Sequence, residues 1–160
     1  ILAPRHIERA GEVVDICNEY EWSPELRSNH GPDTPCGADV VIWDTIGELR
    51  YLYSLAAVCF VGGSLVKRGG HNILEPAACG RAAFYGPGMD NFRASAQALE
   101  SGGGGRCAAN AAELVDAIEE YMKNEELRHR MDTAALDVVK KNAGASERAY
   151  SLFKEFDGGR

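Results

Sequence analysis

Apolar positions along the chain fall into two kinds of segment, short continuous runs and longer stretches with helical spacing. The continuous runs predict buried strands at residues 1–3, 39–43, 58–61 and 82–85, with weaker candidates at 25–28 and 106–108. The helical spacing predicts helices at residues 7–17, 49–57, 73–79 and 91–101, and throughout the chain from residue 111. Because strands alternate with helices, we expect an α/β fold with a parallel sheet and helices on both of its faces.

Five of the predicted helices have one apolar face that is expected to pack on the sheet or on another helix. These faces are Ile7, Ala10, Val13, Val14 and Cys17; Leu49, Leu52, Tyr53 and Ala56; Leu114, Ile118 and Met122; Leu127, Met131, Ala135 and Val138; and Tyr150, Leu152 and Phe153. The charged residues between them are expected to form a solvated surface. A break at residues 142–144 is expected to separate the last two helices.

Composition places the chain among ordinary globular proteins. Its 160 residues are 45% hydrophobic and 26% charged, which fits one domain with a proper core. The formal net charge of −7 argues against binding to nucleic acid, whose phosphates require a basic face. The five cysteines are scattered and include no C-x-x-C pair, so we expect reduced thiols rather than a disulfide framework or a zinc site.

The start of the chain and its longest apolar runs bear on where the protein works. No run approaches the roughly 18 apolar residues of a membrane span, and no signal peptide is present. The chain opens on Ile1-Leu2-Ala3 without a Met, as if a strand were already in progress. We therefore expect a fragment of a longer protein, with a processed natural N-terminus as the alternative.

Three polar loops each follow a predicted strand. Pro4-Arg5-His6 follows residue 3, residues 44–48 follow residue 43, and residues 62–75 follow residue 61. In parallel α/β sheets, ligands bind beyond the carboxyl ends of the strands. We therefore expect these loops to converge on one rim of the sheet and to form the binding site.

The third loop has the composition of an anion-binding segment. It contains two glycine pairs together with Lys67, Arg68 and His71, and it leads into a predicted helix start at Asn72. Glycines let backbone N–H groups approach a phosphate, and the first turn of a helix adds unpaired N–H groups at the positive end of its dipole. Lys67 and Arg68 add positive charge, and Arg can bind an anion through two hydrogen bonds.

Two segments fit a helix-capping motif, and each has a second interpretation. In T-x-x-E at residues 45–48, Thr45 and Glu48 would form a capping box; alternatively, Ile46 and Gly47 offer backbone groups to a base. In N-x-x-E at residues 72–75, Asn72 would cap the helix with Glu75 at the third position. Glu75 could instead accept hydrogen bonds from both hydroxyls of a ribose.

The remaining polar residues of the loops carry weaker signals. Arg5 could reach a phosphate or a sugar carboxylate, or could form a surface salt bridge. His6 and His71 are interpreted as structural rather than catalytic, and Asn91 as a helix cap rather than a ligand contact. No H-x-H, H-E-x-x-H or D-x-D pattern is present, so no metal site is expected.

Taken together, these motifs resemble the C-terminal half of bacterial 3-deoxy-D-manno-octulosonic acid (Kdo) transferases. The resemblance rests on APRH at 3–6, DT-I-GEL at 44–49, FVGGSLV-RGGHN-LEPA at 60–77 and GP…NF at 86–92, and it covers essentially the whole chain. That family transfers Kdo from CMP-Kdo to a lipid A precursor and has the GT-B architecture of two Rossmann-like domains. The resemblance implies that residues 1–160 form the donor-binding domain, a Rossmann-like three-layer fold.

The resemblance also implies which residues bind the donor. CMP would be contacted by Pro4, Arg5, Ile46, Gly47, Glu48, Asn72, Ile73, Leu74 and Glu75, with further phosphate or Kdo contacts from Lys67, Arg68 and His71. Ile46 stands where the family often has Met, a change that a backbone contact would tolerate. No metal or other cofactor is implied.

Other parts of the reaction are implied to lie in an N-terminal domain outside this chain. They are the general base, a Glu, together with the acceptor-binding surface and the membrane attachment, which would place the full-length enzyme at the cytoplasmic face of the inner membrane and this domain in the cytoplasm. Two alternatives stay open: the donor domain of another GT-B glycosyltransferase or a UDP-sugar epimerase, and a non-catalytic nucleotide-binding module.

Overall fold

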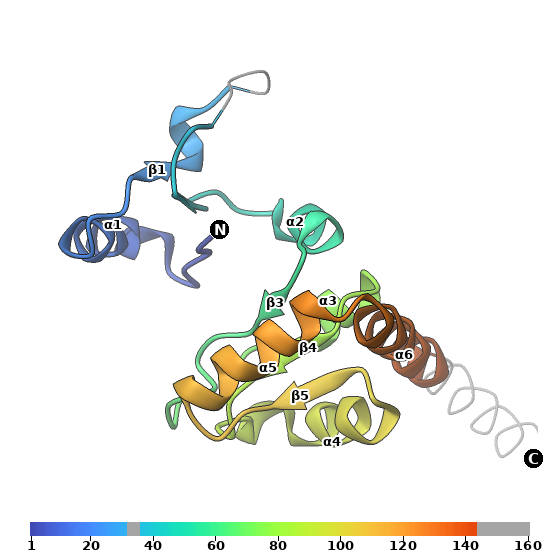
Figure 1. Ribbon diagram of the computed structural model, residues 1–160. Helices are drawn as coiled ribbons and strands as arrows, with labels where there is room; N and C mark the ends of the chain where they lie inside the picture. Colours follow the sequence, from blue (N-terminus) through green and yellow to red (C-terminus); the bar gives the residue numbers. More distant parts are fainter. Residues whose placement is uncertain (32–35, 144–160) are drawn as a thin grey trace, which may run out of the picture. The chain divides into compact units, whose positions relative to one another are not determined.

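The computed structural model describes residues 1–31 and 36–143 and divides the chain into two compact units, Ile1–Leu49 and Arg50–Arg160, each described here by itself. The first contains η1 (Ile7–Arg9), α1 (Ala10–Glu19), β1 (Pro24–Leu26), η2 (Arg27–Asn29) and β2 (Val40–Ile42). Helix α2 (Leu49–Leu55) begins at the boundary. The second unit continues with β3 (Cys59–Phe60), α3 (Leu74–Ala78), β4 (Ala83–Tyr85), η3 (Asp90–Phe92), α4 (Arg93–Gly102), β5 (Gly105–Cys107), α5 (Ala111–Lys123) and α6 (Glu125–Ala143) (Figure 1).

The first unit is organised on β2, which pairs with a neighbour on each side. Strand β1 runs parallel to it, with Leu26 opposite Ile42, and Leu2 forms a single parallel bridge to Ile42. The predicted strand at residues 1–3 is thus reduced to one bridge, because Pro4 has no N–H with which to continue the ladder. Ile42 is completely buried, and α1 buries Ala10 and Cys17 of its predicted apolar face. The prediction for Ile7 is wrong, because this residue lies in the preceding 3₁₀ turn η1 and is exposed.

The second unit contains a parallel sheet in the order β3-β4-β5 (Figure 1). Its central strand β4 is buried on both faces, and successive side chains point to opposite sides. Ala83 and Tyr85 belong to a cluster with residues of α4 and α6, whereas Phe84 packs with α5 in a second cluster. Two helical layers therefore enclose the sheet, as the alternation of elements predicts.

Helices α5 and α6 confirm the predicted core positions with one exception. Met131, Ala135 and Val138 of α6 are buried, but Met122 of α5 is 41% exposed. The buried stripe of α5 is instead Leu114, Ala117 and Tyr121, whose spacing of three and four places them on one face. The prediction for Met122 is therefore wrong. The predicted helix around residues 150–153 lies outside the described residues.

Helix α3 ends as predicted at a glycine. Gly80 has a φ of +69°, a left-handed conformation that glycine adopts at little cost. The Gly80 N–H donates to the Ala77 carbonyl and the Arg81 N–H to the Pro76 carbonyl, both at 3.0 Å. This pair of bonds is a Schellman motif, which closes the helix and directs the chain into β4.

All five cysteines are free thiols, as expected from their scatter. Burial raises the pKa of the Cys59 thiol to about 11, which keeps it protonated at neutral pH. With no disulfide among these cysteines, the sheet depends on packing, and one tight contact in that packing is at Gly104, where an added Cβ would overlap backbone atoms of Ala135 in α6.

A Gly104→Ala substitution is therefore expected to lower the free energy of unfolding by at least about 2 kcal/mol, because the α6 backbone would have to move. Denaturant unfolding of the purified chain measures this. The matched control is Gly11→Ala in α1, where an added Cβ meets nothing within 4 Å and is expected to be neutral or stabilising. Equal stability of the Gly104 variant and the native chain would contradict the packing described.

Candidate functional site

The glycine-rich loop, residues 62–71, is held in place by Ser64. This side chain is fully buried, donates from Oγ to the Val61 carbonyl at 2.6 Å and accepts from the Gly86 N–H at 2.9 Å. Its carbonyl accepts from the Gly88 N–H at 2.7 Å. The bonds from Gly86 and Gly88 tie the loop to the turn at residues 86–91, which follows β4, and the bond to Val61 ties it to the end of the preceding strand. A polar group so buried is stable only when it is hydrogen-bonded, so Ser64 fixes the start of the loop.

Glycines in and around this loop allow its backbone to pack closely against that turn. Gly69 and Gly70 have φ values of +80° and +71°, and a Cβ at either would overlap Asn91 or Met89. The Gly69 carbonyl accepts a hydrogen bond from the Asn91 N–H at 3.1 Å. The sequence interpretation assigned the glycines to close approach by a phosphate; in the structure, close approach of the chain to itself accounts for these two.

Asn91 does not cap a helix, contrary to the prediction. It lies inside η3, and the residues at the starts of η3 and α4 are Met89 and Phe92, neither of which makes a side-chain capping bond. The chain tightens into a 3₁₀ turn one residue earlier than predicted, so Asn91 falls within the turn. Its side chain packs against Gly69 instead.

The tip of the glycine-rich loop is exposed. Residues 65–68 all face solvent, and two of them are Lys67 and Arg68. The backbone behind them is closed by an Arg68 N–H bond to the Val66 carbonyl at 2.8 Å and a Gly70 N–H bond to the Gly63 carbonyl at 3.2 Å. Two cations therefore stand on a loop whose base is fixed, an arrangement suited to an anion.

The start of α3 differs from the predicted cap by one residue: the helix begins at Leu74 with Ile73 at the N-cap position and no side-chain capping bond there, so Asn72 lies one residue before the cap. The Leu74 N–H donates to Asn72 Oδ1 at 3.1 Å, and the Asn72 amide donates to Glu75 Oε1 at 3.2 Å. Glu75 is exposed and Leu74 half-buried, whereas Ile73 is completely buried in the core. The Glu75 carboxylate is thus the group of this segment that faces solvent. The buried side chain of Ile73 anchors the segment in the core.

Electrostatics around Glu75 keep a neighbouring phenol neutral. Burial, and then the Glu75 carboxylate, raise the pKa of Tyr53 to about 12.

His71 packs beside Gly63, with its Nδ1 3.1 Å from the Gly70 carbonyl. This contact agrees with a structural role for the imidazole, which helps to hold the two glycine pairs of the loop together.

In the first unit, residues 44–48 do not form the predicted capping box. Gly47 has a φ of +92° and α2 begins only at Leu49, so residue 46 is outside the helix. The Thr45 hydroxyl donates to Glu48 Oε2 at 2.6 Å instead of capping a backbone N–H. The left-handed glycine is the physical reason, because it turns the chain out of the helical path.

This turn leaves its residues in distinct environments. Ile46 is 82% exposed, whereas Glu48 is half-buried, with Arg27 Nη2 lying 3.6 Å from its Oε1. Asp44 accepts from the Ser28 N–H and hydroxyl, and the hydroxyl bond holds the pKa of the Asp44 carboxyl below its ordinary value. The predicted contact residues Ile46 and Gly47 are therefore presented by an ordered loop.

Pro4 and Arg5 follow the bridge at Leu2, with Arg5 exposed and Pro4 half-buried. These two and residues 46–48 lie in the first unit, whereas residues 67–75 lie in the second. Within each unit the predicted residues lie on loops after strands, as expected. Their convergence on one rim stays a prediction.

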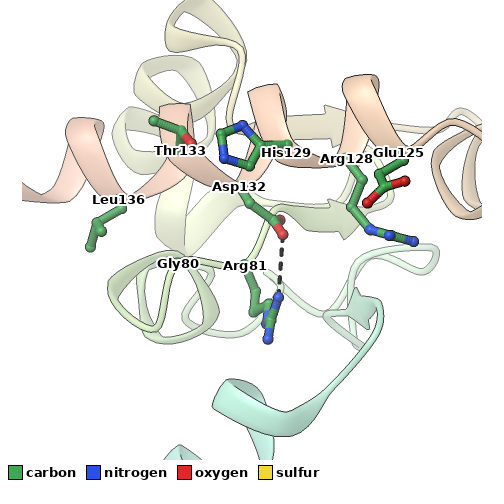
Figure 2. Close-up of a pocket in the computed structure, with 8 residues that line it drawn as sticks. All are labelled: Gly80, Arg81, Glu125, Arg128, His129, Asp132, Thr133 and Leu136. Atoms are coloured by element: carbon green, nitrogen blue, oxygen red, sulfur yellow. Dashed lines mark hydrogen bonds and ion pairs between the residues drawn. The ribbon is translucent and has the colours of Figure 1, made fainter.

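In the described part of the chain, two hollows are well enough formed to consider as binding sites. Neither is lined by a residue that is predicted to contact CMP. The first, of about 350 Å³, lies in the second unit between the end of α3 and α6 (Figure 2). It is lined by Gly80, Arg81, Glu125, Arg128, His129, Asp132, Thr133 and Leu136. Both positively and negatively charged side chains line this hollow, so its charge favours neither an anionic nor a cationic ligand.

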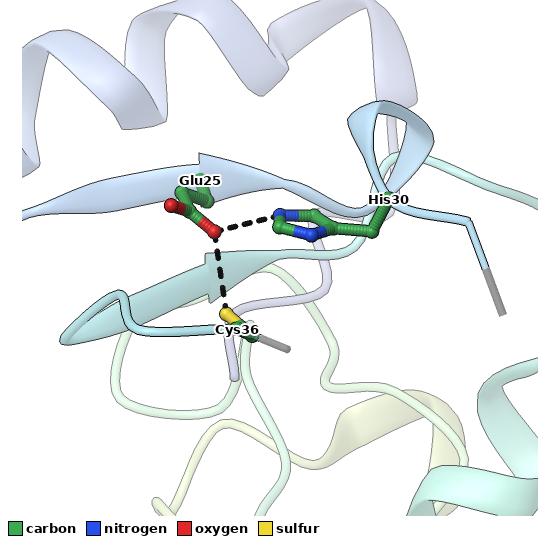
Figure 3. Close-up of side chains that lie close together, drawn as sticks. All are labelled: Glu25, His30 and Cys36. Carbon is green, nitrogen blue, oxygen red and sulfur yellow. Dashed lines mark hydrogen bonds and ion pairs between the residues drawn. The ribbon is translucent and has the colours of Figure 1, made fainter. Parts of the chain in front are cut away.

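The second hollow, of about 250 Å³, lies in the first unit and is lined by Ile1, Arg27, His30, Gly31, Cys36, Val41 and Trp43. Beside it the side chains of Glu25, His30 and Cys36 point toward one another (Figure 3). One donor atom from each lies within 4.8 Å of the others. Sequence reasoning missed this group because the spacing E-x₄-H-x₅-C matches no short metal-binding motif.

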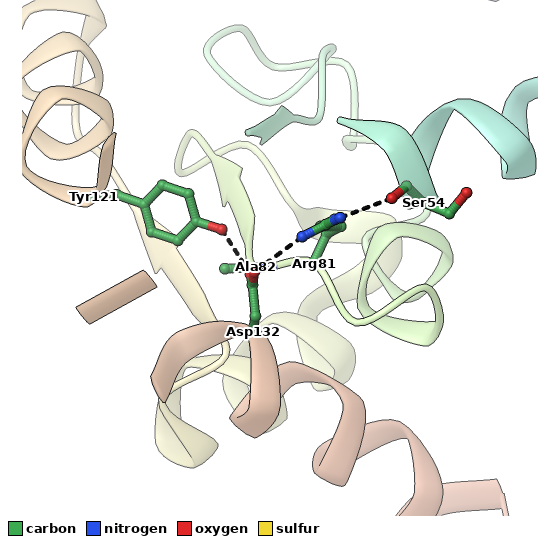
Figure 4. A network of polar contacts seen from close by, with 5 residues as sticks. All are labelled: Ser54, Arg81, Ala82, Tyr121 and Asp132. Carbon is green, nitrogen blue, oxygen red and sulfur yellow. Dashed lines mark hydrogen bonds and ion pairs between the residues drawn. The ribbon is translucent and has the colours of Figure 1, made fainter. Parts of the chain in front are cut away.

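Asp132, which lines the first hollow, is part of a structural network (Figure 4). Its Oδ1 accepts from the Tyr121 hydroxyl at 2.6 Å and from the Ala82 N–H at 2.8 Å. Arg81 lies 3.4 Å from Oδ2 and also donates to the Ser54 carbonyl at 2.7 Å. This network joins α5 and α6 to the start of β4. The Asp132 carboxylate therefore has a structural role, and no ligand is needed to account for its position.

Over the described residues, no helix has the length and apolar character to cross a membrane. No protein-family model matches the chain.

Comparison with known proteins gives long matches. The chain is 35% identical over 158 residues to the 3-deoxy-D-manno-octulosonic acid transferase of Haemophilus influenzae, a match that covers 98% of this chain and 36% of that protein. It is 33% identical over 157 residues to the Chlamydophila psittaci enzyme of the same name, again 98% of this chain and 36% of the relative. The chain thus spans about a third of the length of these relatives.

A solved structure matches on the scale of one domain. The C-terminal CMP-Kdo binding domain of WaaA from Acinetobacter baumannii aligns with a TM-score of 0.75 and 33% identity, covering 85% of this chain and 70% of that one. Both the sequence and the α/β architecture agree over this length. The chain therefore belongs to the family of 3-deoxy-D-manno-octulosonic acid transferases and is similar to their C-terminal domain.

Proposed function

We propose that this chain binds the CMP part of CMP-Kdo and supplies the donor half of a Kdo transferase. The observation that carries the proposal is the likeness to a CMP-Kdo binding domain over 70% of that domain's length. The glycine-rich loop, which carries two exposed cations and leads to an exposed carboxylate at the start of α3, supports it independently. The chemistry of these groups suits a nucleoside monophosphate.

The phosphate is assigned to the basic residues. Lys67 and Arg68 stand on the fixed loop, and Arg5 is exposed after the first bridge. When the bond between the Kdo anomeric carbon and the CMP oxygen breaks, negative charge grows on the departing phosphate. Cations held in place before the reaction stabilise that charge without reorganisation. Their role is electrostatic and requires no covalent step.

The nucleoside is assigned to the other two loops. Glu75 is exposed at the start of α3 and can accept hydrogen bonds from both ribose hydroxyls. Asn72 and Leu74 hold the carboxylate in position, and the buried Ile73 anchors the segment in the core. The exposed turn at Ile46 and Gly47 offers backbone groups to the base, and Glu48 and Pro4 are assigned as further contacts.

The complete reaction requires residues outside this chain. In the proposed mechanism a Glu of an N-terminal domain removes the proton of a lipid A precursor hydroxyl, which attacks the anomeric carbon with inversion as CMP leaves. The acceptor surface and the membrane attachment belong to that domain as well. The full-length enzyme would then work at the cytoplasmic face of the inner membrane, with this domain on the cytoplasmic side.

The ribose assignment predicts that Glu75→Ala weakens CMP binding by about 10- to 100-fold, the loss expected for hydrogen bonds to a charged group. Isothermal titration calorimetry with CMP and with 2′-deoxy-CMP measures it. The native chain should prefer CMP, and the variant should lose that preference. The control is Glu126→Ala on the exposed face of α6. An unchanged CMP affinity in the Glu75 variant would refute the ribose assignment.

The phosphate assignment predicts a different pattern for Lys67→Ala combined with Arg68→Ala. Affinity for CMP should fall about 3- to 10-fold, because exposed charges contribute modestly. Affinity for cytidine, which has no phosphate, should not change. Lys140→Ala on α6 serves as the matched control for lost positive charge. An equal loss for CMP and cytidine would show that the loop acts only through structure.

The division of labour predicts that the isolated chain binds CMP weakly and transfers no Kdo, because the proposed general base lies elsewhere. A radiolabelled Kdo transfer assay on a lipid A precursor, with a full-length family enzyme as positive control, tests this. Comparing CMP with UMP in the same titrations separates a CMP-Kdo domain from a domain that uses UDP-sugars. Kdo transfer by this chain alone would overturn the proposed location of the base.

A further inference from the structure

Glu25, His30 and Cys36 form a cluster that the proposed donor binding does not use. Glu25 lies in β1, His30 follows η2, and Cys36 precedes β2. Glu25 Oε2 lies 2.7 Å from His30 Nε2 and accepts from Cys36 Sγ at 3.4 Å (Figure 3). One carboxylate oxygen is therefore the common neighbour of an imidazole and a thiol.

These three donors have the chemistry of a zinc site. Thiolate, imidazole and carboxylate are the side chains that bind Zn²⁺ in proteins, and the thiolate disfavours Mg²⁺ and Ca²⁺. Three protein ligands with a fourth position for water is a common zinc arrangement. The adjoining hollow of about 250 Å³ has room for that water.

The imidazole of His30 provides a second, independent observation. Its side chain is only 15% exposed, and among the described residues neither ring nitrogen has a hydrogen-bond partner. Nε2 lies 2.7 Å from Glu25 Oε2, an ion-pair distance, but the two atoms do not form a hydrogen bond. Buried polar atoms in this state are rare, and an ion is one of the groups that satisfy them.

Two of the distances between ligand atoms come near those of a zinc site, and the ligand atoms of Cys36 and His30 lie within 4.8 Å of each other. With zinc–ligand bonds of about 2.0–2.3 Å, ligand atoms in a tetrahedral site lie about 3.3–3.7 Å apart. The 3.4 Å between Cys36 Sγ and Glu25 Oε2 is already in that range. The 2.7 Å between His30 Nε2 and the same oxygen must open by about half an ångström, which a change in side-chain torsion provides.

A hydrogen bond from Arg27 fixes the backbone around His30. Arg27 Nη1 donates to the His30 carbonyl at 2.7 Å and fixes the turn that carries the imidazole. The Arg27 charge, which also lines the hollow, is engaged by Glu48 at 3.6 Å and by the Trp43 ring at 5.2 Å. The cation is thereby partly neutralised beside the cluster.

From this geometry we propose that Glu25, His30 and Cys36 bind one zinc ion in the first unit, separately from the donor site. Binding exchanges a proton for the metal: the Cys36 S–H bond breaks, its proton passes to solvent, and a zinc–sulfur bond forms. Zinc bound to the folded chain and not to the unfolded chain also stabilises the fold.

The test is a titration of the chain without a histidine tag, stripped by chelator, with Zn²⁺ and separately with Co²⁺. One equivalent is expected to bind at micromolar concentration or below. Cobalt should give a thiolate charge-transfer band, and zinc should raise the melting temperature. Cys36→Ser and His30→Gln should each weaken binding by about tenfold or more. The matched controls Cys107→Ser and His129→Gln remove exposed residues of the same types and should not change it.

A second measurement needs no variant. Zinc should protect Cys36 from alkylation by iodoacetamide while leaving the exposed Cys107 reactive, as peptide mass spectrometry can show. Absence of saturable binding of one equivalent would overturn the zinc site. So would binding that Cys36→Ser leaves unchanged, or equal alkylation of Cys36 with and without zinc. CMP affinity is measured separately, so failure here leaves the proposed donor binding standing.

Discussion

The glycine-rich loop depends on one buried hydroxyl. Ser64 is fully enclosed, and its side chain and carbonyl together make bonds to Val61, Gly86 and Gly88. These bonds tie the end of β3 to the turn that follows β4. Without them a loop so rich in glycine would lose little enthalpy and gain much entropy by opening. The exposed Lys67 and Arg68 and the start of α3 are ordered because these bonds fix the base of the loop that carries them.

Much of this architecture could be predicted from the sequence. Apolar runs marked β2, β3 and β4, and helical spacing marked the cores of α1 and α6, because burial on a sheet imposes these periods directly. The glycine at the end of α3 followed from local hydrogen-bonding rules, whereas the cap predicted at Asn72 falls one residue before the observed N-cap position, Ile73. Met122 failed because several registers of α5 carry apolar residues, and only packing against Phe84 selects Tyr121.

The loops were less predictable, for physical reasons. Gly69 and Gly70 looked like glycines that face a ligand, and the structure shows that they accommodate the neighbouring turn. Thr45 and Glu48 matched a capping box, but the left-handed Gly47 between them prevents it. The cluster at Glu25, His30 and Cys36 gave no signal, because its three side chains come together only through strand pairing and an intervening turn. Tertiary contacts of this kind leave little trace in local spacing.

The family assignment and the local geometry support each other from independent directions. The likeness to a CMP-Kdo binding domain says nothing about hydrogen bonds in this chain, and the ordered loop says nothing about the identity of the nucleotide. Together they assign different parts of one ligand to different loops. The meeting of these loops around one nucleotide is a proposal that experiment can test directly.

The most direct measurement is an NMR titration of the ¹⁵N-labelled chain with CMP. If the account is correct, amide shifts change together at residues 4–5, 46–48 and 67–75, with one affinity for all three segments, because one ligand contacts them all. Shifts confined to one unit, or centred on the hollow beside Arg81 and Asp132, would contradict it.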